Sequence, residues 1–265
     1  MLSLIANIFA LVLYSFASTY LYTHLKQNKA LNTRNFFGLA VSAILMHCLG
    51  IYYATVMTAG LNLGIQNMPS IIFLSINIIV VISSFKKPLH NLLVFLFPLS
   101  IVFIIVAIIF RNLEPHLVAV NVAIGSHILL SIISYSLLTM ASLQAALWSW
   151  QNHQLKSHQL GKIIKILPAL QTMEALIFEL VLAGVITLAL GMAIGFTFID
   201  NIFAQQLVHK TVLSLFGLFI FSVVLWGRYQ LGWRGNTAGR WVIGGFCILM
   251  LAYFGSKLVL EIILK

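Results

Sequence analysis

The sequence predicts an all-α polytopic membrane protein, a bundle of about eight transmembrane helices with both termini on the external side. Of its 265 residues, 61% are hydrophobic and only 8% are charged, and its mean hydropathy is +1.05. These charges are too few to cover a soluble exterior. Uncharged stretches of about 18 or more residues recur along the chain, which is long enough for a helix to cross a bilayer.

The candidate spans each approach the ~20 residues that a bilayer requires. The second and third are separated only by the polar, glycine-containing break AGLNLGIQNMPS, because no charge occurs from Asn35 to Phe85. The first span lacks a basic segment before it and a clear cleavage site, so we expect it to be retained. No soluble domain is visible, which predicts a single integral membrane domain over 1–265. The predicted spans are 3–23, 36–57, 67–85, 90–110, 126–150, 174–198, 210–227 and 241–261.

Basic residues predict how the spans are oriented. Eleven of the 15 lysines and arginines fall in the loops that follow the first, third, fifth and seventh spans. Since basic loops stay in the cytoplasm, both termini are predicted outside, and the protein in the inner membrane of a bacterium. The net charge of +10 is scattered between apolar segments and therefore does not indicate nucleic-acid binding. The eleven residues are Lys26, Lys29, Arg34, Lys86, Lys87, Lys156, Lys162, Lys165, Arg228, Arg234 and Arg240.

Three histidines lie within a predicted span or at its end, where a polar side chain is costly unless it finds a partner or serves a function. His47 falls near the middle of the second span, where it either packs by a hydrogen bond to another helix or serves a function. His127 opens the fifth span and His209 opens the seventh, both from outside. Two neutral imidazoles that face each other can ligate a haem iron, although two separate interfacial histidines give the same spacing. Without HxxxH or HExxH, no ligand set for another metal is predicted.

A polar face continues from His127 along its helix. At about 100° per residue, Ser131, Ser134, Tyr135 and Ser142 share this face. Small hydroxyl residues allow helices to pack closely, and they can equally line a polar crevice that opens outward. The sequence leaves these two roles open.

Charged residues at the span ends suggest two further contacts. Glu174 suits the first turn of the sixth helix, where a carboxylate meets the positive end of the helix dipole. Glu179 is deeper and needs a partner, for which Arg228 is a candidate. Lys210, beside His209, is an exception to the basic-inside bias. On the external side it can snorkel to the interface or meet a haem propionate or a lipid phosphate.

Several motifs carry a family resemblance. Lys210, Ser214, WGR at 226–228, GWRG at 232–235 (with Trp233 and Arg234) and AYFGSK at 252–257 stand near the end. HILLSIISY at 127–135, PALQTME at 168–174 and LMHCLGIY at 45–52 precede them. Together these motifs resemble the cytochrome c assembly membrane proteins of the CcsA/ResC/CcmC type, and more narrowly their short eight-span YpjD branch.

This resemblance implies that haem is held at the external face for attachment to apocytochrome c. It implies that His127 is an external haem ligand and that His47 matches a transmembrane histidine of the family. The family's tryptophan-rich motif is missing before the seventh span, and its second transmembrane histidine falls where Trp226 and Gly227 stand. We therefore expect a binding and scaffold protein rather than an autonomous enzyme. It would hold haem b through His127 and His209, with His47 lower in the same crevice.

The expected partners are the lipid bilayer, haem, apocytochrome c and other assembly proteins. The branch also carries the label CorE, which implies the alternative of an accessory to divalent-cation (magnesium or cobalt) efflux or resistance without haem. In that case His47 and Glu179 would lie near an ion route, although hard cations prefer several carboxylates. A structural helper whose polar residues only hold helices together is the third possibility.

Overall fold

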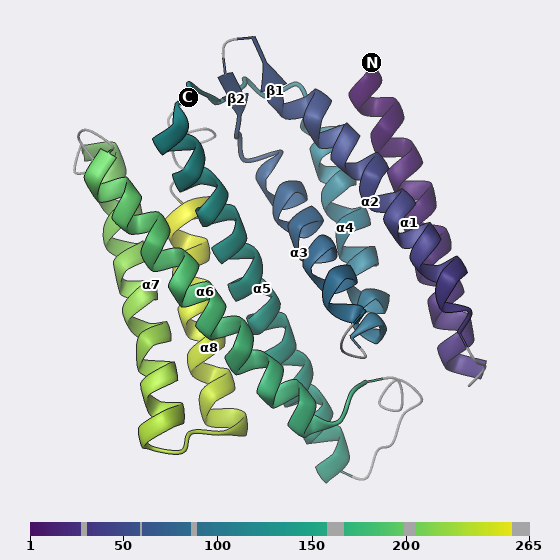
Figure 1. Ribbon diagram of the computed structural model, residues 1–265, viewed down its shortest axis with the longest axis vertical. Coiled ribbons are helices and arrows are strands. Elements are labelled where there is room, and N and C mark those ends of the chain that lie inside the picture. The colour runs from purple at the N-terminus through teal and green to yellow at the C-terminus, as the bar shows by residue number, and fades with distance from the viewer. Residues whose placement is uncertain (28–30, 59, 86–88, 158–166, 199–204, 256–265) are drawn as a thin grey trace. The chain divides into compact units, whose positions relative to one another are not determined.

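The computed structural model describes residues 1–27, 31–58, 60–85, 89–157, 167–198 and 205–255 (Figure 1). Within these residues the chain forms eight α-helices, and seven helical segments are long and apolar enough to cross a membrane when the short turns that adjoin α4 and α8 are included. Helix α3, with 17 residues, is apolar but falls below that length. The predicted helical membrane bundle is therefore confirmed. Basic residues of the orientation argument that lie outside the described residues are Lys29, Lys86, Lys87, Lys162 and Lys165.

The contacts of the chain cluster into two compact units, and each is described by itself. Unit 1 comprises Met1–Ala119 and Gly161–Pro168. Unit 2 comprises Val120–Leu160 and Ala169–Lys265. His47 therefore belongs to unit 1, whereas His127 and His209 belong to unit 2.

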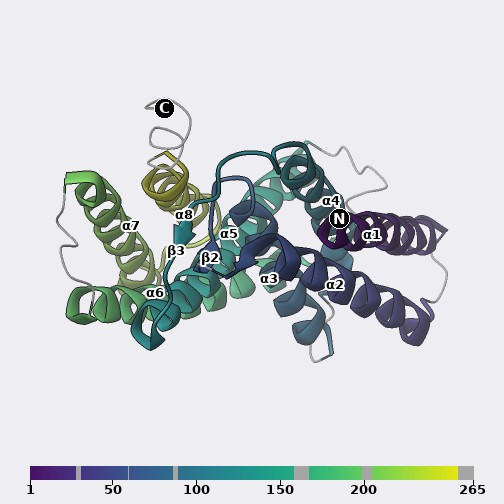
Figure 2. The same cartoon turned by 90° about the horizontal axis from the view of Figure 1, so that it is seen from above.

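In unit 1, α1 (Leu2–Gln27) and α2 (Thr33–Thr55) lie side by side (Figures 1 and 2). Asn32 caps α2 by accepting a hydrogen bond from the Asn35 backbone N–H at 3.2 Å. Buried positions recur every three or four residues, which is the spacing of one helix face. Many are small, so the two backbones approach closely. They are Ala6, Asn7, Ala10, Tyr14, Ala17 and Leu21 on α1 and Phe36, Ala40, Ala43, His47 and Gly50 on α2.

The break after α2 forms a small antiparallel sheet that the sequence did not predict. Its strands, in the order β1 (Val56–Met57), β2 (Gly60–Asn62) and β3 (Leu117–Val118), lie between α2 and α3 and after α4 in the chain. The Asn62 side chain oxygen accepts from the backbone N–H groups of Gly64 at 3.2 Å and His116 at 3.1 Å. These bonds satisfy backbone groups that the short strands leave unpaired.

Two more helices complete the described part of unit 1. Helix α3 (Met68–Ser84) begins with Pro69 in its first turn, where the missing N–H has no helical acceptor. A short 3₁₀ turn, η1 (His90–Leu92), leads into α4 (Leu93–Ile109). Both helices contribute polar residues to the interior of the unit, as described below.

Unit 2 contains α5 (Val122–Lys156), α6 (Leu170–Phe198), α7 (Gln205–Gln230) and α8 (Gly235–Met250), which continues as a π-helical turn, η3 (Leu251–Gly255). The start of α5, the end of α6, the start of α7 and η3 lie at the same end of this unit (Figure 1). Asn121 caps α5 by accepting from the Ile124 N–H at 2.8 Å. The connection between α7 and α8 is short because Gly232 and Gly235 adopt positive φ angles of 65° and 54°.

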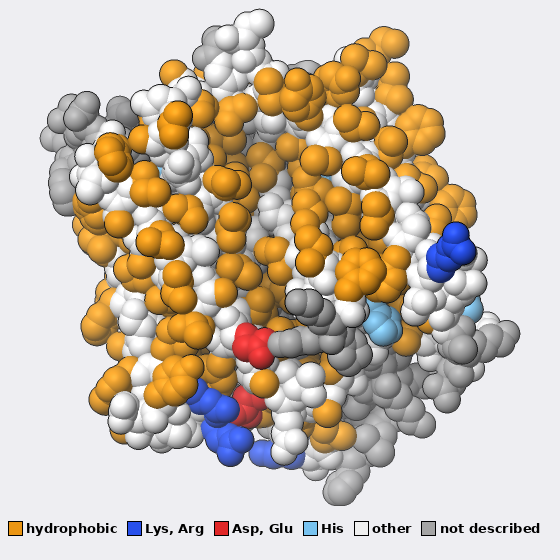
Figure 3. Space-filling view, in the orientation of Figure 1, with side chains coloured by type: hydrophobic (Ala, Val, Ile, Leu, Met, Phe, Trp, Pro, Cys, Tyr) orange, Lys and Arg blue, Asp and Glu red, His pale blue; other side chains and the backbone are white. Residues whose placement is uncertain are grey.

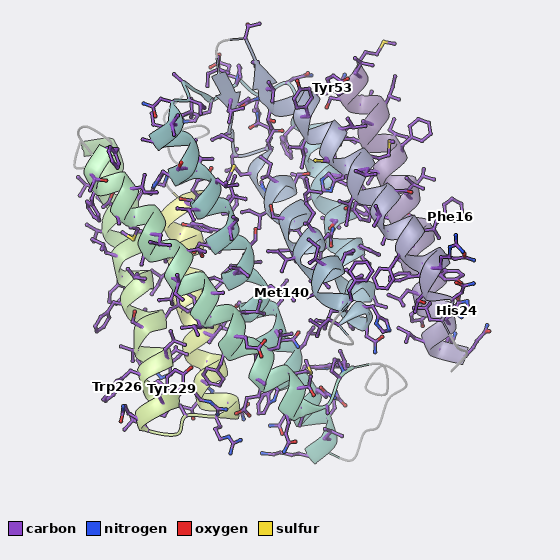
Figure 4. All side chains as sticks on the ribbon, in the orientation of Figure 1. Phe16, His24, Tyr53, Met140, Trp226 and Tyr229 are labelled. Atoms are coloured by element: carbon purple, nitrogen blue, oxygen red, sulfur yellow. The ribbon has the colours of Figure 1, made fainter. Side chains whose placement is uncertain are left out.

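The surface fits a lipid environment. Hydrophobic side chains cover the middle of each unit on the face in Figure 3, whereas lysines and arginines gather near the lower helix ends. Trp226 and Tyr229 lie at the lower end of α7 (Figure 4) and are 56% and 70% exposed. Aromatic residues at a helix end are typical of the interface between membrane and water.

Candidate functional site

The ring of His127 is fixed by the backbone of the neighbouring helix. Its Nδ1 lies 2.7 Å from the carbonyl oxygen of Gly191 on α6. A carbonyl oxygen only accepts, so Nδ1 carries the proton and donates it. The other nitrogen, Nε2, then has its lone pair available and makes no hydrogen bond within the described residues. A histidine in this tautomer is arranged as metal-binding histidines usually are.

Two glycines of α6 make this contact possible. A Cβ atom at Gly195 would stand 3.2 Å from both Cε1 and Nδ1 of His127, and one at Gly191 would stand 3.3 Å from Leu130. Gly195 lies one helical turn after Gly191, so a side chain there would crowd the ring that reaches the Gly191 carbonyl. The half-buried ring of His127 therefore occupies space that α6 leaves empty.

The polar face of α5 divides between two neighbours. Ser134 donates from Oγ to the Gly184 carbonyl at 3.0 Å, and Ser131 faces Gly191. Tyr135 points elsewhere and donates to the Leu249 carbonyl on α8 at 3.0 Å. Of the two roles left open by the sequence, helix packing is the one that these contacts show for Ser134.

Lys210 is half-buried, whereas the neighbouring His209 is exposed. The Lys210 ammonium group lies 5.0 Å from the centre of the Tyr253 ring, and its positive charge acts on His127. No hydrogen bond or ring contact of His209 occurs among the residues that the structure describes. The predicted pairing of His127 with His209 stays a prediction, although α5 and α7, on which they lie, begin at the same end of unit 2 (Figure 1).

His47 occupies a buried polar network in unit 1. Its Nδ1 lies 3.3 Å from the Tyr14 hydroxyl and its Nε2 lies 2.8 Å from the Ser70 hydroxyl. Asn77 donates from Nδ2 to Tyr14 at 3.2 Å and to Ser100 at 2.7 Å, so α1, α2, α3 and α4 are joined. Both ring nitrogens of His47 therefore have hydrogen-bond partners on other helices. These contacts correspond to the packing role, one of the two roles that the sequence left open for His47.

Glu174 joins three elements at the opposite end of unit 2. Its Oε1 accepts from Arg228 Nη1 at 2.9 Å and from Arg234 Nε at 3.2 Å. The Arg228 guanidinium also lies over the Phe178 ring, 4.5 Å from its centre. The structure thus pairs Arg228 with Glu174, whereas the sequence named Arg228 as a candidate partner of Glu179. Glu179 is exposed and lies about 140° around α6 from Glu174.

Trp233 packs into the same connection. Its indole stacks on Trp241 with ring centres 5.5 Å apart, and a Cβ at Gly227 would clash with it at 2.5 Å. The motifs WGR and GWRG therefore act together: the glycine accepts the tryptophan and the arginines meet Glu174. This end of the unit is a structural clamp rather than part of the His127 site.

Within the described ranges, no group of three or more His, Cys, Asp or Glu is close enough to hold a metal ion. His127 therefore offers a single imidazole nitrogen, with the other nitrogen fixed by a hydrogen bond, as a metal-ligating atom of this site. Sequence reasoning found His127 and Lys210 but missed Gly191, Gly195 and Tyr253. The spacing of Gly184, Gly191 and Gly195 on one helix face was the available signal.

Comparisons with known proteins agree with the fold and the motifs. A family model described as "Cytochrome C assembly protein" matches residues 5–264. "Inner membrane protein YpjD" of Escherichia coli (strain K12) is 31% identical over 205 residues, which cover 77% of this chain and 78% of that protein. "Protein HemX" of Brevibacillus brevis is 24% identical over 132 residues, 49% of this chain and 48% of HemX. No solved structure matches.

Proposed function

The chain belongs to the cytochrome c assembly protein family, and on that premise we propose that it is a haem-binding accessory protein of c-type cytochrome assembly. Seven long apolar helices and the similarity to an inner membrane protein make it a multi-pass protein of the inner membrane. The family match and the similarity to HemX support a membrane role in haem and cytochrome biogenesis. The haem site itself is our proposal.

The hydrogen bond from His127 to Gly191 carries this proposal. A neutral imidazole binds iron through one nitrogen, and a hydrogen bond at the other nitrogen fixes the ring and raises its basicity. His127 meets both conditions at the external end of α5. We propose haem b as the group that His127 would hold through Nε2. When bound, this haem would be the one that is passed on for attachment to apocytochrome c.

We propose that His209 would be the second residue to hold this haem. It opens α7 at the same end of unit 2, and its exposed ring is not committed to a described hydrogen bond. His47 does not enter this proposal, because both of its nitrogens are already hydrogen-bonded. The proposed partners are haem, apocytochrome c and other assembly proteins.

The test is a haem assay on the full chain purified in detergent from haem-replete cells. The wild type is expected to show a Soret band and a positive pyridine haemochrome, and His127→Ala is expected to lose most of both. His153→Ala is the matched control, because His153 is exposed near the far end of the same helix. It should retain the haem content of the wild type.

Two results would contradict the proposal. One is wild-type protein that is haem-free after purification and does not take up added haem. The other is a Soret band that His127→Ala leaves unchanged. Cobalt or magnesium sensitivity of a deletion strain with normal cytochromes would instead select the role in cation efflux.

A further inference from the structure

Lys210 is held against an aromatic ring instead of extending into solvent. The side chain is half-buried, and its ammonium nitrogen lies 5.0 Å from the centre of the Tyr253 ring. A lysine that only snorkels would extend its ammonium group toward the aqueous interface. The contact instead holds the ammonium group over the Tyr253 ring, because a cation is attracted to the face of an aromatic ring.

Tyr253 is itself positioned by a second tyrosine. Its ring lies edge-on to Tyr135, with ring centres 5.7 Å apart. Tyr135 is buried, and its hydroxyl donates to the Leu249 carbonyl at 3.0 Å and interacts with the Ser214 side chain. Helices α5, α7 and α8 thus meet at Tyr135, and this junction supports Tyr253 beneath Lys210.

The same junction sets the height of Lys210 relative to His127. Lys210 precedes Ser214 by one turn of α7, about 6 Å along the axis. His127 precedes Tyr135 by eight residues of α5, about 12 Å along the axis. The backbone of Lys210 therefore stands between the level of Tyr135 and the level of His127, on the side of the junction where α5 and α7 begin.

A site with one fixed imidazole and one fixed cation suits a ligand that carries a metal centre and an anion. We infer that Lys210 is the positioning residue for a carboxylate of the ligand that His127 binds. This inference rests on the proposed function, in which the ligand is haem and the carboxylate is a propionate. Lysine binds such a group as a compact point charge, so the interaction is electrostatic rather than bidentate.

The experiment compares haem with its dimethyl ester, in which both propionates lack charge. Full-length protein purified in detergent is titrated with each compound, and binding is followed at the Soret band. Lys210→Ala is expected to raise the Kd for haem about tenfold, because a hydrogen bond to a charged group is lost. The same variant should bind the dimethyl ester as the wild type does. Lys210→Arg should stay within about threefold of the wild type for haem.

Lys156→Ala is the matched control, since Lys156 is exposed at the far end of α5. It should not change either Kd. Equal losses for haem and ester in Lys210→Ala would show a structural role and overturn the inference. A haem Kd that Lys210→Ala leaves unchanged would also overturn the inference. This holds even if the variant weakens the binding of anionic phospholipid.

The proposed function can fail separately. If the wild type shows no Soret band that depends on His127, the haem proposal fails and this inference fails with it. The other case is a wild type that shows the His127-dependent band. If Lys210→Ala then binds haem with the Kd of the wild type, and the wild type binds the dimethyl ester as tightly as haem, only the role of Lys210 fails.

Discussion

His127 donates its Nδ1 proton to the carbonyl oxygen of Gly191 over 2.7 Å, so the backbone of α6 holds the ring of the proposed haem ligand. A side-chain acceptor could rotate away, whereas a carbonyl within a helix is fixed by its own neighbours. The arrangement leaves Nε2 for a ligand. It also makes the site sensitive to α6 residues that never touch haem.

Gly195→Ala is expected to weaken haem binding without unfolding the protein. The added Cβ would stand 3.2 Å from the His127 ring, so the ring must move by a few tenths of an ångström. Loss of an outer-shell contact typically lowers metal affinity by about tenfold or more. Haem titration measures the effect. Gly244→Ala, where a Cβ meets nothing within 4 Å, is the control and should bind haem normally. Equal Kd values for the two variants would contradict the positioning role of α6.

Glu174→Gln is expected to lower the thermal stability of unit 2. The substitution removes the charge that Arg228 and Arg234 share, and the Glu174 and Arg228 side chains are 16% and 27% exposed. Because these groups keep some solvent contact, the loss is about 1 kcal/mol, or about 2–4 °C in Tm.

A double-mutant cycle with Arg228→Gln checks this pair by thermal unfolding in detergent. The second substitution should cost less in the Glu174→Gln background than in the wild type. Arg240→Gln, an exposed residue at the start of α8, serves as the control. Additive losses would show that Glu174 and Arg228 do not interact.

The sequence predicted the helices well because hydrophobicity is decisive inside a bilayer. The sequence was less informative for segments outside the bilayer, where hydrophobicity alone does not decide the secondary structure. Helix α5 was predicted over 126–150 but runs from Val122 to Lys156, since polar residues continue the helix beyond its apolar part. Strands β1, β2 and β3 were missed because segments of two or three residues carry no periodic pattern.

The site was predicted only where its residues are chemically rare. A histidine or lysine at the external end of a span stands out, so His127 and Lys210 were found. The acceptor for His127 is a backbone carbonyl, which any residue provides, and so Gly191 gave no chemical signal. The sequence offered Arg228 only as a candidate partner of the deeper Glu179, because depth along α6 does not reveal which face of this helix meets α7; in the structure Arg228 pairs with Glu174.

His47→Ala is expected to destabilise unit 1. The change leaves the buried Tyr14 and Ser70 hydroxyls without their shared partner, at a cost of about 2 kcal/mol or more. Thermal unfolding measures this loss. Ser42→Ala is the control, because Ser42 is exposed on the same helix and bonds only to the Gly38 carbonyl at 2.9 Å. A changed Soret band with normal stability would assign His47 to the cofactor, as the family resemblance implies.

His209→Ala is expected to retain haem but to change its coordination. Loss of the proposed second ligand leaves iron with His127, which converts low-spin six-coordinate haem to a high-spin form. Electron paramagnetic resonance of the oxidised protein distinguishes the two. His153→Ala should keep the low-spin signal. A low-spin spectrum in His209→Ala identical to that of the wild type would exclude His209 as the second ligand.

The most direct measurement of the central claim is the absorption spectrum of His127→Gly with and without added imidazole. The substitution removes the ring but leaves the space beside Gly195, where a free imidazole can replace it. We predict that the variant loses the wild-type Soret band and that imidazole restores it in a saturable manner. A band that persists without imidazole, or one that imidazole does not restore in folded protein, would contradict ligation of haem by His127.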